Sequence, residues 1–168
     1  MSRTSIYRGR VVDFGLEEAT LPDGRRLTLE IIRHPGASAV VPLHADGTVT
    51  LLSQYRHAGG GMMIEVPAGV LEPGEAPAAC AARELSEEAQ LAGTLALLAS
   101  IHTTPGFTDE RIHLFLATDL RPTEGRPEAD EYLRPIRLPL TEALGWIDDG
   151  RITDAKTICA LLLASRRA

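Results

Sequence analysis

Residues 69–91 read Gly-Val-Leu-Glu-Pro-Gly-Glu-Ala-Pro-Ala-Ala-Cys-Ala-Ala-Arg-Glu-Leu-Ser-Glu-Glu-Ala-Gln-Leu, a run that is dense in acidic side chains. Residues 69–74 hold two glycines and one proline, which predicts a tight loop. Pro77 suits the first turn of a helix, because its fixed φ and missing N–H cost least there. The alanine-rich residues that follow are strong helix formers, so we expect a loop that leads into a helix.

Three glutamates share one face of this expected helix. Glu84, Glu87 and Glu88 stand at positions i, i+3 and i+4, where like charges repel by roughly a few tenths of a kcal/mol per contact. Arg83 can neutralise one of them and reach Glu75 in the preceding loop. The remaining carboxylates suit a hard cation such as Mg²⁺ or Mn²⁺, which prefers oxygen ligands. A solvated acidic surface is the alternative, and the helix by itself does not decide between the two.

This pattern resembles the signature of the Nudix hydrolases, which cleave nucleoside diphosphates linked to another moiety. The matching positions are Gly69, Glu75, Arg83–Glu88 and Leu91. At one position the chain departs from the family, because Gln90 stands where the signature has glycine. That glycine would end the helix in a left-handed conformation, which glutamine adopts reluctantly, so we expect Gly93 to take the turn instead.

Segments outside the signature are similar to the ADP-ribose pyrophosphatase branch of the family. They are residues 34–37 (His-Pro-Gly-Ala), 65–69 (Glu-Val-Pro-Ala-Gly), 105–110 (Pro-Gly-Phe-Thr-Asp-Glu) and 154–157 (Asp-Ala-Lys-Thr). The resemblance implies an α/β fold, with a Nudix α/β/α sandwich and a mixed sheet over residues 35–168. A small antiparallel β unit, residues 1–34, would precede it. Hydrolases of GDP-mannose and other nucleoside-diphosphate sugars share much of the pattern.

The resemblance also implies a metal-dependent reaction. Two or three Mg²⁺ ions, for which Mn²⁺ can substitute, would bridge the substrate diphosphate. Their ligands would be Glu84, Glu87, Glu88 and the main-chain carbonyl of Ala68. Glu75 and Arg83 would support catalysis by locking the loop to the helix. The general base or water-positioning residue would be Glu131, with Asp130 and Glu128 as rivals.

Glu65 attracts notice by itself, because it lies in the apolar run 63–69. A glutamate in an apolar strand can lie at a strand edge that faces water, or it can point into a pocket. The neighbouring acidic motif favours the pocket. The resemblance implies that Glu65 accepts hydrogen bonds from the adenine amino group. It also implies that Arg56 pairs with the diphosphate or a ribose.

The resemblance places further substrate contacts in two other regions. The terminal ribose would be held by Thr104, the Gly106 amide and Glu110. In a homodimer formed through the N-terminal strands, the partner's site would be reached by Val11 and Glu30. Some relatives have an arginine just before the position of Glu30, and this chain has Thr28 in its place.

The composition excludes several other classes of protein. A chain of 168 residues with 44% hydrophobic residues fits one domain with a real core. The net charge of −6, with scattered basic residues, argues against nucleic-acid binding. No apolar run approaches ~18 residues, so we expect neither export nor a membrane span, and a cytoplasmic location. Cys80 and Cys159 lack a disulfide or zinc spacing and are expected to be buried free thiols.

Apolar and alternating runs predict the remaining elements. Strands are expected at 6–14, 16–21 and 27–32, which need the main body or a second subunit to pack on. Further strands are expected at 37–43, 49–55, 63–69, 95–101, 111–117 and 132–138. Helices are expected at 140–148, capped by Thr141, and at 155–167, capped by Asp154, with Leu162 on the buried side.

We therefore expect an enzyme that hydrolyses ADP-ribose to AMP and ribose 5-phosphate with Mg²⁺. Within the enzymes, the alternative is another nucleoside-diphosphate sugar such as GDP-mannose. The alternative of another class is a catalytically silent, nucleotide-binding regulatory Nudix domain. The intact glutamates of the signature argue against that reading, because a binding module has no need to hold so many repelling acids together.

Overall fold

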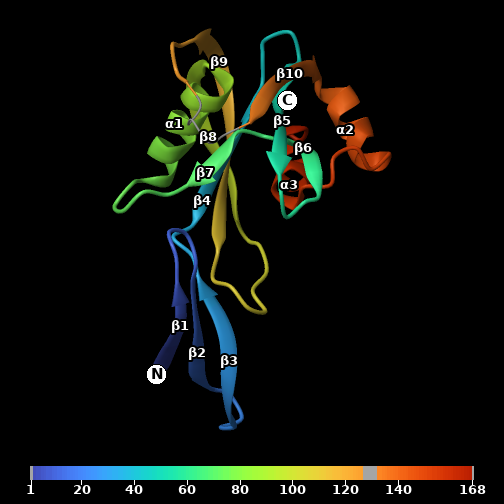
Figure 1. The fold of residues 1–168 in the computed structure, drawn as a ribbon. Helices are drawn as coiled ribbons and strands as arrows, with labels where there is room; N and C mark the ends of the chain where they lie inside the picture. Colours follow the sequence, from blue (N-terminus) through green and yellow to red (C-terminus); the bar gives the residue numbers. More distant parts are fainter. Residues whose placement is uncertain (1, 127–131, 168) are drawn as a thin grey trace.

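The N-terminal residues form a three-stranded antiparallel sheet that extends away from the rest of the chain (Figure 1). Its strands are β1 (Arg3–Arg8), β2 (Asp13–Thr20) and β3 (Arg26–Arg33), in a computed structural model that describes residues 2–126 and 132–167. The single strand predicted over 6–14 is wrong. The chain turns between β1 and β2, where the Gly9 amide donates to the Val12 carbonyl at 2.9 Å, because the two strands pair as a hairpin.

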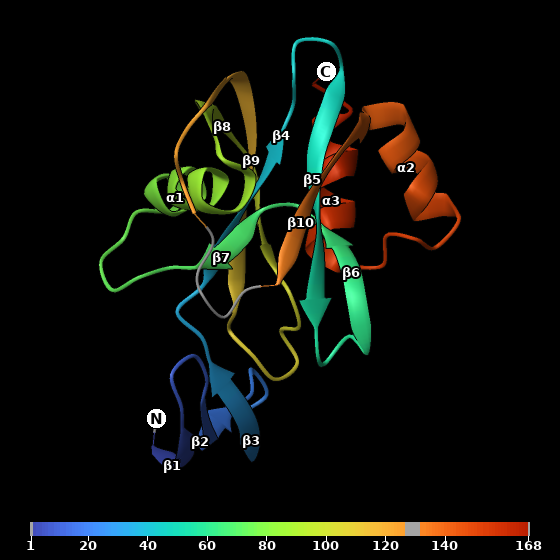
Figure 2. The same cartoon turned by 45° about the horizontal axis from the view of Figure 1, so that its top comes forward.

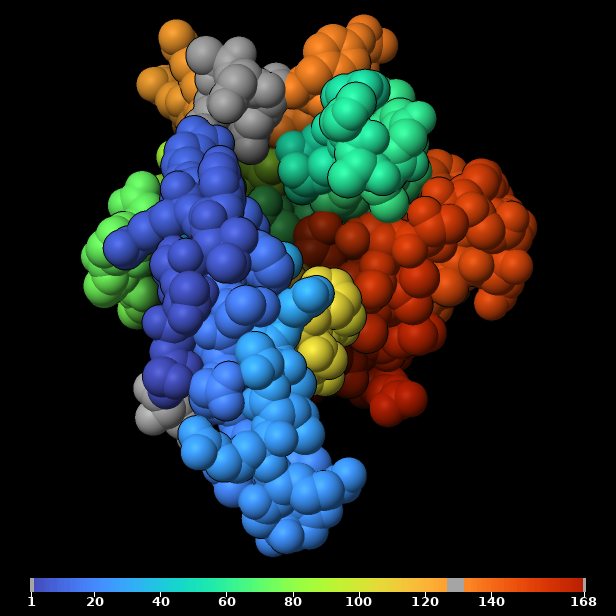
Figure 3. Space-filling model, turned by 60° about the horizontal axis from the view of Figure 1, so that its bottom comes forward, coloured from blue at the N-terminus to red at the C-terminus, as the bar shows by residue number. Residues whose placement is uncertain are grey.

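This sheet touches the body through the loop between β8 and β9. The Ile32 amide donates to the Phe107 carbonyl at 2.8 Å, and Arg33 Nη1 donates to Asp109 at 2.9 Å. In Figure 3 the loop, drawn in yellow, lies beside the blue N-terminal sheet. The end of β3 is therefore fixed to the body, while all six residues of β1 are exposed.

Two further sheets form the body. In the sheet β7-β4-β9-β8, strands β4 and β9 run parallel and the other neighbours run antiparallel, which confirms the expected mixed sheet. The sheet β10-β5-β6 is antiparallel. The strands are β4 (Ala37–Pro42), β5 (Thr48–Arg56), β6 (Gly61–Glu65), β7 (Ala68–Val70), β8 (Leu91–His102), β9 (Arg111–Pro122) and β10 (Leu133–Pro139).

Helices cover both sides of these sheets. Helix α1 (Pro77–Ala89) lies on one side, and α2 (Leu140–Asp148) and α3 (Ala155–Ala164) lie on the other (Figure 2). Leu85 and Phe115 belong to the core beneath α1, and Val41 and Leu161 to the core beneath α3. All six residues of β4 are buried, as expected for a strand covered on both faces. The α/β/α sandwich predicted from the sequence is thus confirmed.

The run 63–69 is two strands rather than the single strand we predicted. It breaks at Val66 and Pro67, so that β6 pairs with β5 in one sheet and β7 pairs with β4 in the other. Proline has no N–H for a ladder, and the Val66 amide donates instead to Thr157 Oγ1 in α3 at 3.0 Å. This crossing carries the chain from Glu65 on one side of the body to the loop before α1.

Both ends of α1 are well defined. Pro77 occupies the first turn, as predicted. The expectation that Gly93 takes the exit turn is wrong, because Gln90 itself adopts the left-handed conformation at φ 55°. Its amide donates to the Ser86 carbonyl at 3.1 Å, and its side chain donates to the Gly125 carbonyl at 3.3 Å. These contacts hold a backbone conformation that a non-glycine residue rarely adopts.

The two C-terminal helices differ in detail from the prediction. Pro139, not Thr141, is the N-cap residue of α2, whereas Asp154 caps α3 as predicted by accepting the Thr157 amide at 2.9 Å. Helix α3 ends at Ala164 rather than at 167, and Leu162 is exposed. In the described part of the chain, no helix is long and apolar enough to cross a membrane.

Candidate active site

A cleft of about 1040 Å³ lies where β4 and β9 begin, beside the loop that joins β7 to α1. The loop and α1 line one part of it, and Arg56 with the first residues of α3 line another. The N-terminal unit contributes Arg10 and Val11. The predicted site residues that line the cleft are Val11, Arg56, Ala68, Glu75, Arg83, Glu84 and Glu110.

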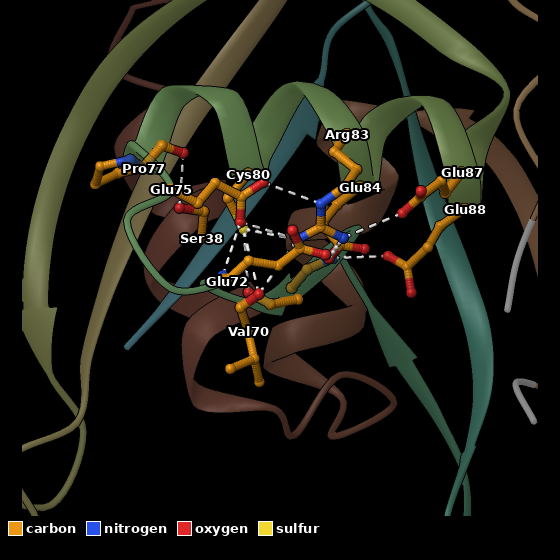
Figure 4. Close-up of polar contacts among 12 residues, drawn as sticks. Ser38, Val70, Glu72, Glu75, Pro77, Cys80, Arg83, Glu84, Glu87 and Glu88 are labelled. Carbon is orange, nitrogen blue, oxygen red and sulfur yellow. Dashed lines mark hydrogen bonds and ion pairs between the residues drawn. The ribbon is translucent and has the colours of Figure 1, made fainter. Parts of the chain in front are cut away.

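The signature residues gather around one guanidinium (Figure 4). Arg83 donates from Nε and Nη2 to the two oxygens of Glu75, at 3.0 and 3.1 Å. Its Nη1 donates to Glu84 at 2.6 Å and to Glu87 at 3.1 Å. The predicted contact between Arg83 and Glu75 is present, and the guanidinium also bonds to two of the helix glutamates rather than to one. The hydrogen bonds from Arg83, as the main cause, hold the pKa of Glu75 below its usual range.

Glu88 and Glu84 are both fixed against β7. Glu88 is buried, with 1% of its surface exposed, and its Oε2 accepts the Ala68 amide at 2.8 Å. The Glu84 carboxylate lies so close to Gly69 that a Cβ added there would stand 1.7 Å from Oε1. Only glycine leaves room for this carboxylate, which gives the first glycine of the signature a physical reason.

Cys80 lies beneath the same loop. Its Sγ is 3.5 Å from the Gly69 carbonyl, and burial raises the pKa of this thiol to about 11. Cys80 is thus a buried free thiol, as predicted, whereas the same expectation for Cys159 is wrong, because that side chain is only half buried. Neither forms a disulfide.

We call Glu75, Arg83, Glu84, Glu87 and Glu88 the acidic wall; the first three line the cleft, whereas Glu87 and Glu88 stand beside them on α1 and do not line it. Four carboxylates stand there with one guanidinium, and hard oxygen donors in excess of cations are the donor set that Mg²⁺ prefers. Within residues 2–126 and 132–167, no three His, Cys, Asp or Glu side chains already stand close enough to hold a metal ion. The chemistry of the acidic wall therefore fits a divalent cation, while its present geometry is organised by Arg83.

A second cluster stands where α3 begins. Glu65 is 2% exposed, and it accepts Arg56 Nε at 3.0 Å, Arg56 Nη2 at 2.9 Å and Lys156 Nζ at 2.6 Å. Lys156 Nζ also lies 3.0 Å from Asp154. We call Arg56, Glu65, Asp154 and Lys156 the ion-pair wall. The reading of Glu65 as a strand edge facing water is wrong, because the carboxylate is buried under two cations.

Opposing effects act on the Glu65 carboxyl. Burial raises its pKa, but hydrogen bonds and charge from Arg56 and Lys156 together outweigh burial and bring the pKa below its ordinary value. Hydrogen bonding to Glu65 likewise raises the pKa of Arg56. Glu65 and Arg56 are therefore both charged at neutral pH.

Lys156 was not singled out from the sequence. It lies in the quoted segment 154–157, in the first turn of α3, where a cation opposes the helix dipole. A cation at this unfavourable position was the one sign in the sequence that Lys156 has an anionic partner. In the fold, its partners are Glu65 and Asp154.

The predicted ribose-binding residues lie in an exposed turn. Thr104 accepts the Phe107 amide at 3.1 Å through its carbonyl, and neither Thr104 nor Gly106 lines the cleft. Glu110 does line it, and its Oε2 accepts the hydroxyl of Thr103 at 2.8 Å. Thr103 also lines the cleft but was not predicted as a site residue, because the resemblance rests on residues 105–110 that follow it.

The remaining predicted residues lie at the periphery or outside the described residues. Val11 lines the cleft of its own chain, and Glu30 is exposed on β3 opposite Leu16. Thr28 donates to Glu18 at 2.7 Å. The predicted base and its rivals, Glu131, Asp130 and Glu128, lie outside the described residues.

An α/β/α sandwich that sets an acid-rich helix against a glycine loop defines a hydrolase of the Nudix type. The family model for the NUDIX domain matches residues 32–161, and the chain belongs to this family. Over 96% of its length it is 36% identical to 89% of an ADP-ribose pyrophosphatase of Bacillus subtilis. Over 93% of its length it is 40% identical to 86% of a methanol dehydrogenase activator of Bacillus methanolicus.

Two other proteins extend this comparison. A GDP-mannose pyrophosphatase of Pectobacterium atrosepticum is 36% identical over 77% of this chain and 72% of its own length. The crystal structure of an ADP compounds hydrolase superposes with a TM-score of 0.85, at 22% identity, covering 99% of this chain and 91% of that one. This likeness confirms the fold.

Proposed function

We propose that this Nudix pyrophosphatase hydrolyses the diphosphate bond of ADP-ribose to AMP and ribose 5-phosphate, with Mg²⁺ as its cofactor and Mn²⁺ as a substitute. The observation that carries the proposal is a cleft that is lined on one side by Glu75, Arg83 and Glu84 of the acidic wall and on the other by two side-chain cations, Arg56 and Lys156. The names of relatives that are 35–36% identical over nearly the whole chain support ADP-ribose as the substrate.

The acidic wall would hold the metal. Its ligands in this proposal are Glu84, Glu87, Glu88 and the carbonyl of Ala68. When bound, Mg²⁺ supplies charge neutralisation for the phosphate oxygens and a bound water of lowered pKa. The chain's own part is to fix these ligands: Arg83 holds Glu84 against Gly69, and the Ala68 amide holds Glu88.

A proton acceptor for the attacking water is assigned to Glu131, with Asp130 and Glu128 as rivals. Replacing Glu131 by Gln tests this assignment separately from metal binding. A fall in kcat of about 10²-fold or more is the scale expected of a general base. An unchanged kcat would pass the role to Asp130, Glu128 or a metal-bound water.

At the substrate end, Arg56 would bind the diphosphate, and Glu110 with Thr104 and the Gly106 amide would bind the terminal ribose. A homodimer formed through residues 1–34 would bring Val11 and Glu30 towards the partner's site, with residues 35–168 as the catalytic domain. In support of the dimer, β1 presents Ile6 and Tyr7, which are 56% and 61% exposed. Apolar side chains of this size are more stable when a partner covers them.

Two alternatives have specific support. GDP-mannose is the rival substrate, because pyrophosphatases of that name are 33–36% identical to the chain. A regulator of another protein is the rival of a different class, because the Bacillus methanolicus relative is named an activator. The four carboxylates of the acidic wall favour a hydrolase over a silent regulator, since they outnumber the one guanidinium among them and repel one another.

The deciding experiment is a substrate panel with Mg²⁺ and with EDTA. Phosphate release after phosphatase coupling is measured from ADP-ribose, GDP-mannose, ADP-glucose, NADH and dinucleoside polyphosphates. Mg²⁺-dependent cleavage of ADP-ribose above the others supports the proposal. If another compound is cleaved faster, that compound replaces ADP-ribose as the proposed substrate. If nothing is cleaved with any metal, the result favours a catalytically silent regulatory domain.

A further inference from the structure

The carboxylate of Glu65 has little capacity left for a ligand. Its Oε1 accepts Arg56 Nε, and its Oε2 accepts both Arg56 Nη2 and Lys156 Nζ. With 2% of its side chain exposed, Glu65 is not among the residues that line the cleft. To accept a hydrogen bond from a nucleobase amino group, it would have to give up a charged contact, which is stronger than a neutral one.

The two cations beside Glu65, in contrast, do line the cleft. Arg56 is 40% exposed and uses Nε and Nη2 on Glu65, so its Nη1 donors are directed elsewhere. Lys156 is 14% exposed, and of its three N–H groups two face Glu65 and Asp154. Each cation therefore keeps donor capacity for a ligand in the cleft.

The cluster is also rigid. Arg56 forms a fork on one carboxylate, and Lys156 is held between two. Asp154 is itself fixed, because it caps α3 by accepting the amide and hydroxyl of Thr157 at 2.9 and 2.6 Å. Donors held in place before binding lose less side-chain freedom when an anion arrives.

We propose that Glu65 is a positioning residue rather than a base-reading one. It holds Arg56 and Lys156 side by side so that both bind the phosphate oxygens of a nucleoside diphosphate. Lys156 is thereby a substrate-binding residue of this chain, and selection of the base falls to residues other than Glu65. The inference rests on the proposed hydrolysis of a nucleoside-diphosphate sugar.

The test compares two substrates that differ only in the base. ADP-ribose carries a 6-amino group, whereas IDP-ribose carries a carbonyl oxygen there. Glu65→Gln and Lys156→Met should each lower kcat/KM on both substrates by the same factor, about 10- to 100-fold for a lost charged hydrogen bond. For Lys156→Met the loss should fall mainly on KM, because the contact serves binding before and during reaction.

Two controls separate this role from a structural one. Lys156→Arg keeps the charge and should retain kcat/KM within about fivefold of wild type. Arg137→Met removes one cation from an exposed pair with Asp46 outside the cleft and should leave kcat/KM unchanged. If Lys156→Met does not fold, the double variant Glu65→Gln/Lys156→Met, which removes one charge of each sign, replaces it with the same expectation.

Two results overturn the inference. One is a tenfold or larger change in the ratio of ADP-ribose to IDP-ribose turnover in Glu65→Gln, which would make Glu65 a reader of the base. The other is wild-type KM in Lys156→Met. If wild type cleaves neither substrate, the proposed function fails, and the same variants are compared by their dissociation constants for ADP and IDP.

Discussion

The acidic wall and the ion-pair wall each contribute residues to the lining of the same cleft, but they balance charge differently. The acidic wall has four carboxylates and one guanidinium, so even after Arg83 has bonded to three of them it holds excess negative charge. The ion-pair wall has two carboxylates and two cations, joined by three ion pairs with N···O distances of 2.9, 2.6 and 3.0 Å.

The two walls therefore differ in whether their charge is balanced by the chain's own side chains. In the proposed function, an Mg²⁺ ion compensates the carboxylate charge that Arg83 leaves over in the acidic wall, and it would supply a bound water of lowered pKa. The ion-pair wall is complete without a metal and already presents donors to an anion. In the proposed function, the substrate diphosphate would therefore lie between a metal at the acidic wall and the two side-chain cations.

The largest expected effect comes from the acidic wall. Glu88→Gln should lower kcat by at least ~10²-fold, because a main electrostatic stabiliser is lost. The folded state should change little, since glutamine can still accept the Ala68 amide. Steady-state kinetics with Mg²⁺ and a thermal melt measure both, with the exposed Glu142→Gln in α2 as the matched control. Turnover like wild type would remove Glu88 from the metal site.

Arg83→Lys tests how the acidic wall is held together. One ammonium cannot reproduce a fork that serves three carboxylates, so the free energy of unfolding should fall by about 2 kcal/mol without metal. Saturating Mg²⁺ should reduce this loss, since the ion compensates the same carboxylates. Urea unfolding in Mg²⁺ and in EDTA gives both values. An equal loss of unfolding free energy in Mg²⁺ and in EDTA would mean that Arg83 and the metal do not compensate the same carboxylates.

The ion-pair wall should make the unfolding free energy depend on pH in the acidic range. The folded-state pKa of Glu65 lies below its ordinary value near 4.5, so its contribution is present above that pH and is lost as pH falls through the folded pKa. Each unit of depression corresponds to about 1.4 kcal/mol. Unfolding free energy between pH 6 and pH 3 should therefore decline less steeply in Glu65→Gln than in wild type. Parallel slopes would contradict the assignment.

The smallest effect is expected at the end of α1. Gln90→Gly restores the glycine of the family signature. Glycine adopts the left-handed conformation without the steric cost that glutamine has, which should raise the unfolding free energy of the variant by roughly 1 kcal/mol. It also removes the hydrogen bond to Gly125, which costs roughly as much. The unfolding free energy should stay within about 1 kcal/mol of wild type. A larger gain in urea unfolding would mean that the side-chain bond contributes nothing.

The acidic wall was largely predictable because it is local. Glu75 and Arg83 are eight residues apart, and helix geometry brings the glutamates to one face. The α/β/α sandwich followed from the same signature. What the sequence did not reveal about α1 was that Gln90 would take the left-handed turn, because that depends on Thr123 and Gly125 from a distant strand end.

The ion-pair wall was not predictable from local pattern. Lys156 and Glu65 are 91 residues apart, and they meet only because α3 packs beneath the crossing between β6 and β7. The same reasoning explains the wrong strand over 63–69, whose two halves join different sheets. The N-terminal break at residues 9–12 depended on a hairpin whose turn has no strong sequence signal.

Mg²⁺ binding tests the contrast between the walls most directly. Isothermal titration of Mg²⁺ into wild type, Glu88→Gln and Lys156→Met, without substrate, separates a wall that needs a metal from one that does not. We predict binding to wild type and Lys156→Met with similar affinity, and at least ~10-fold weaker binding to Glu88→Gln, because carboxylate charge sets affinity for such cations. Unchanged affinity in Glu88→Gln, or lost affinity in Lys156→Met, would contradict the account.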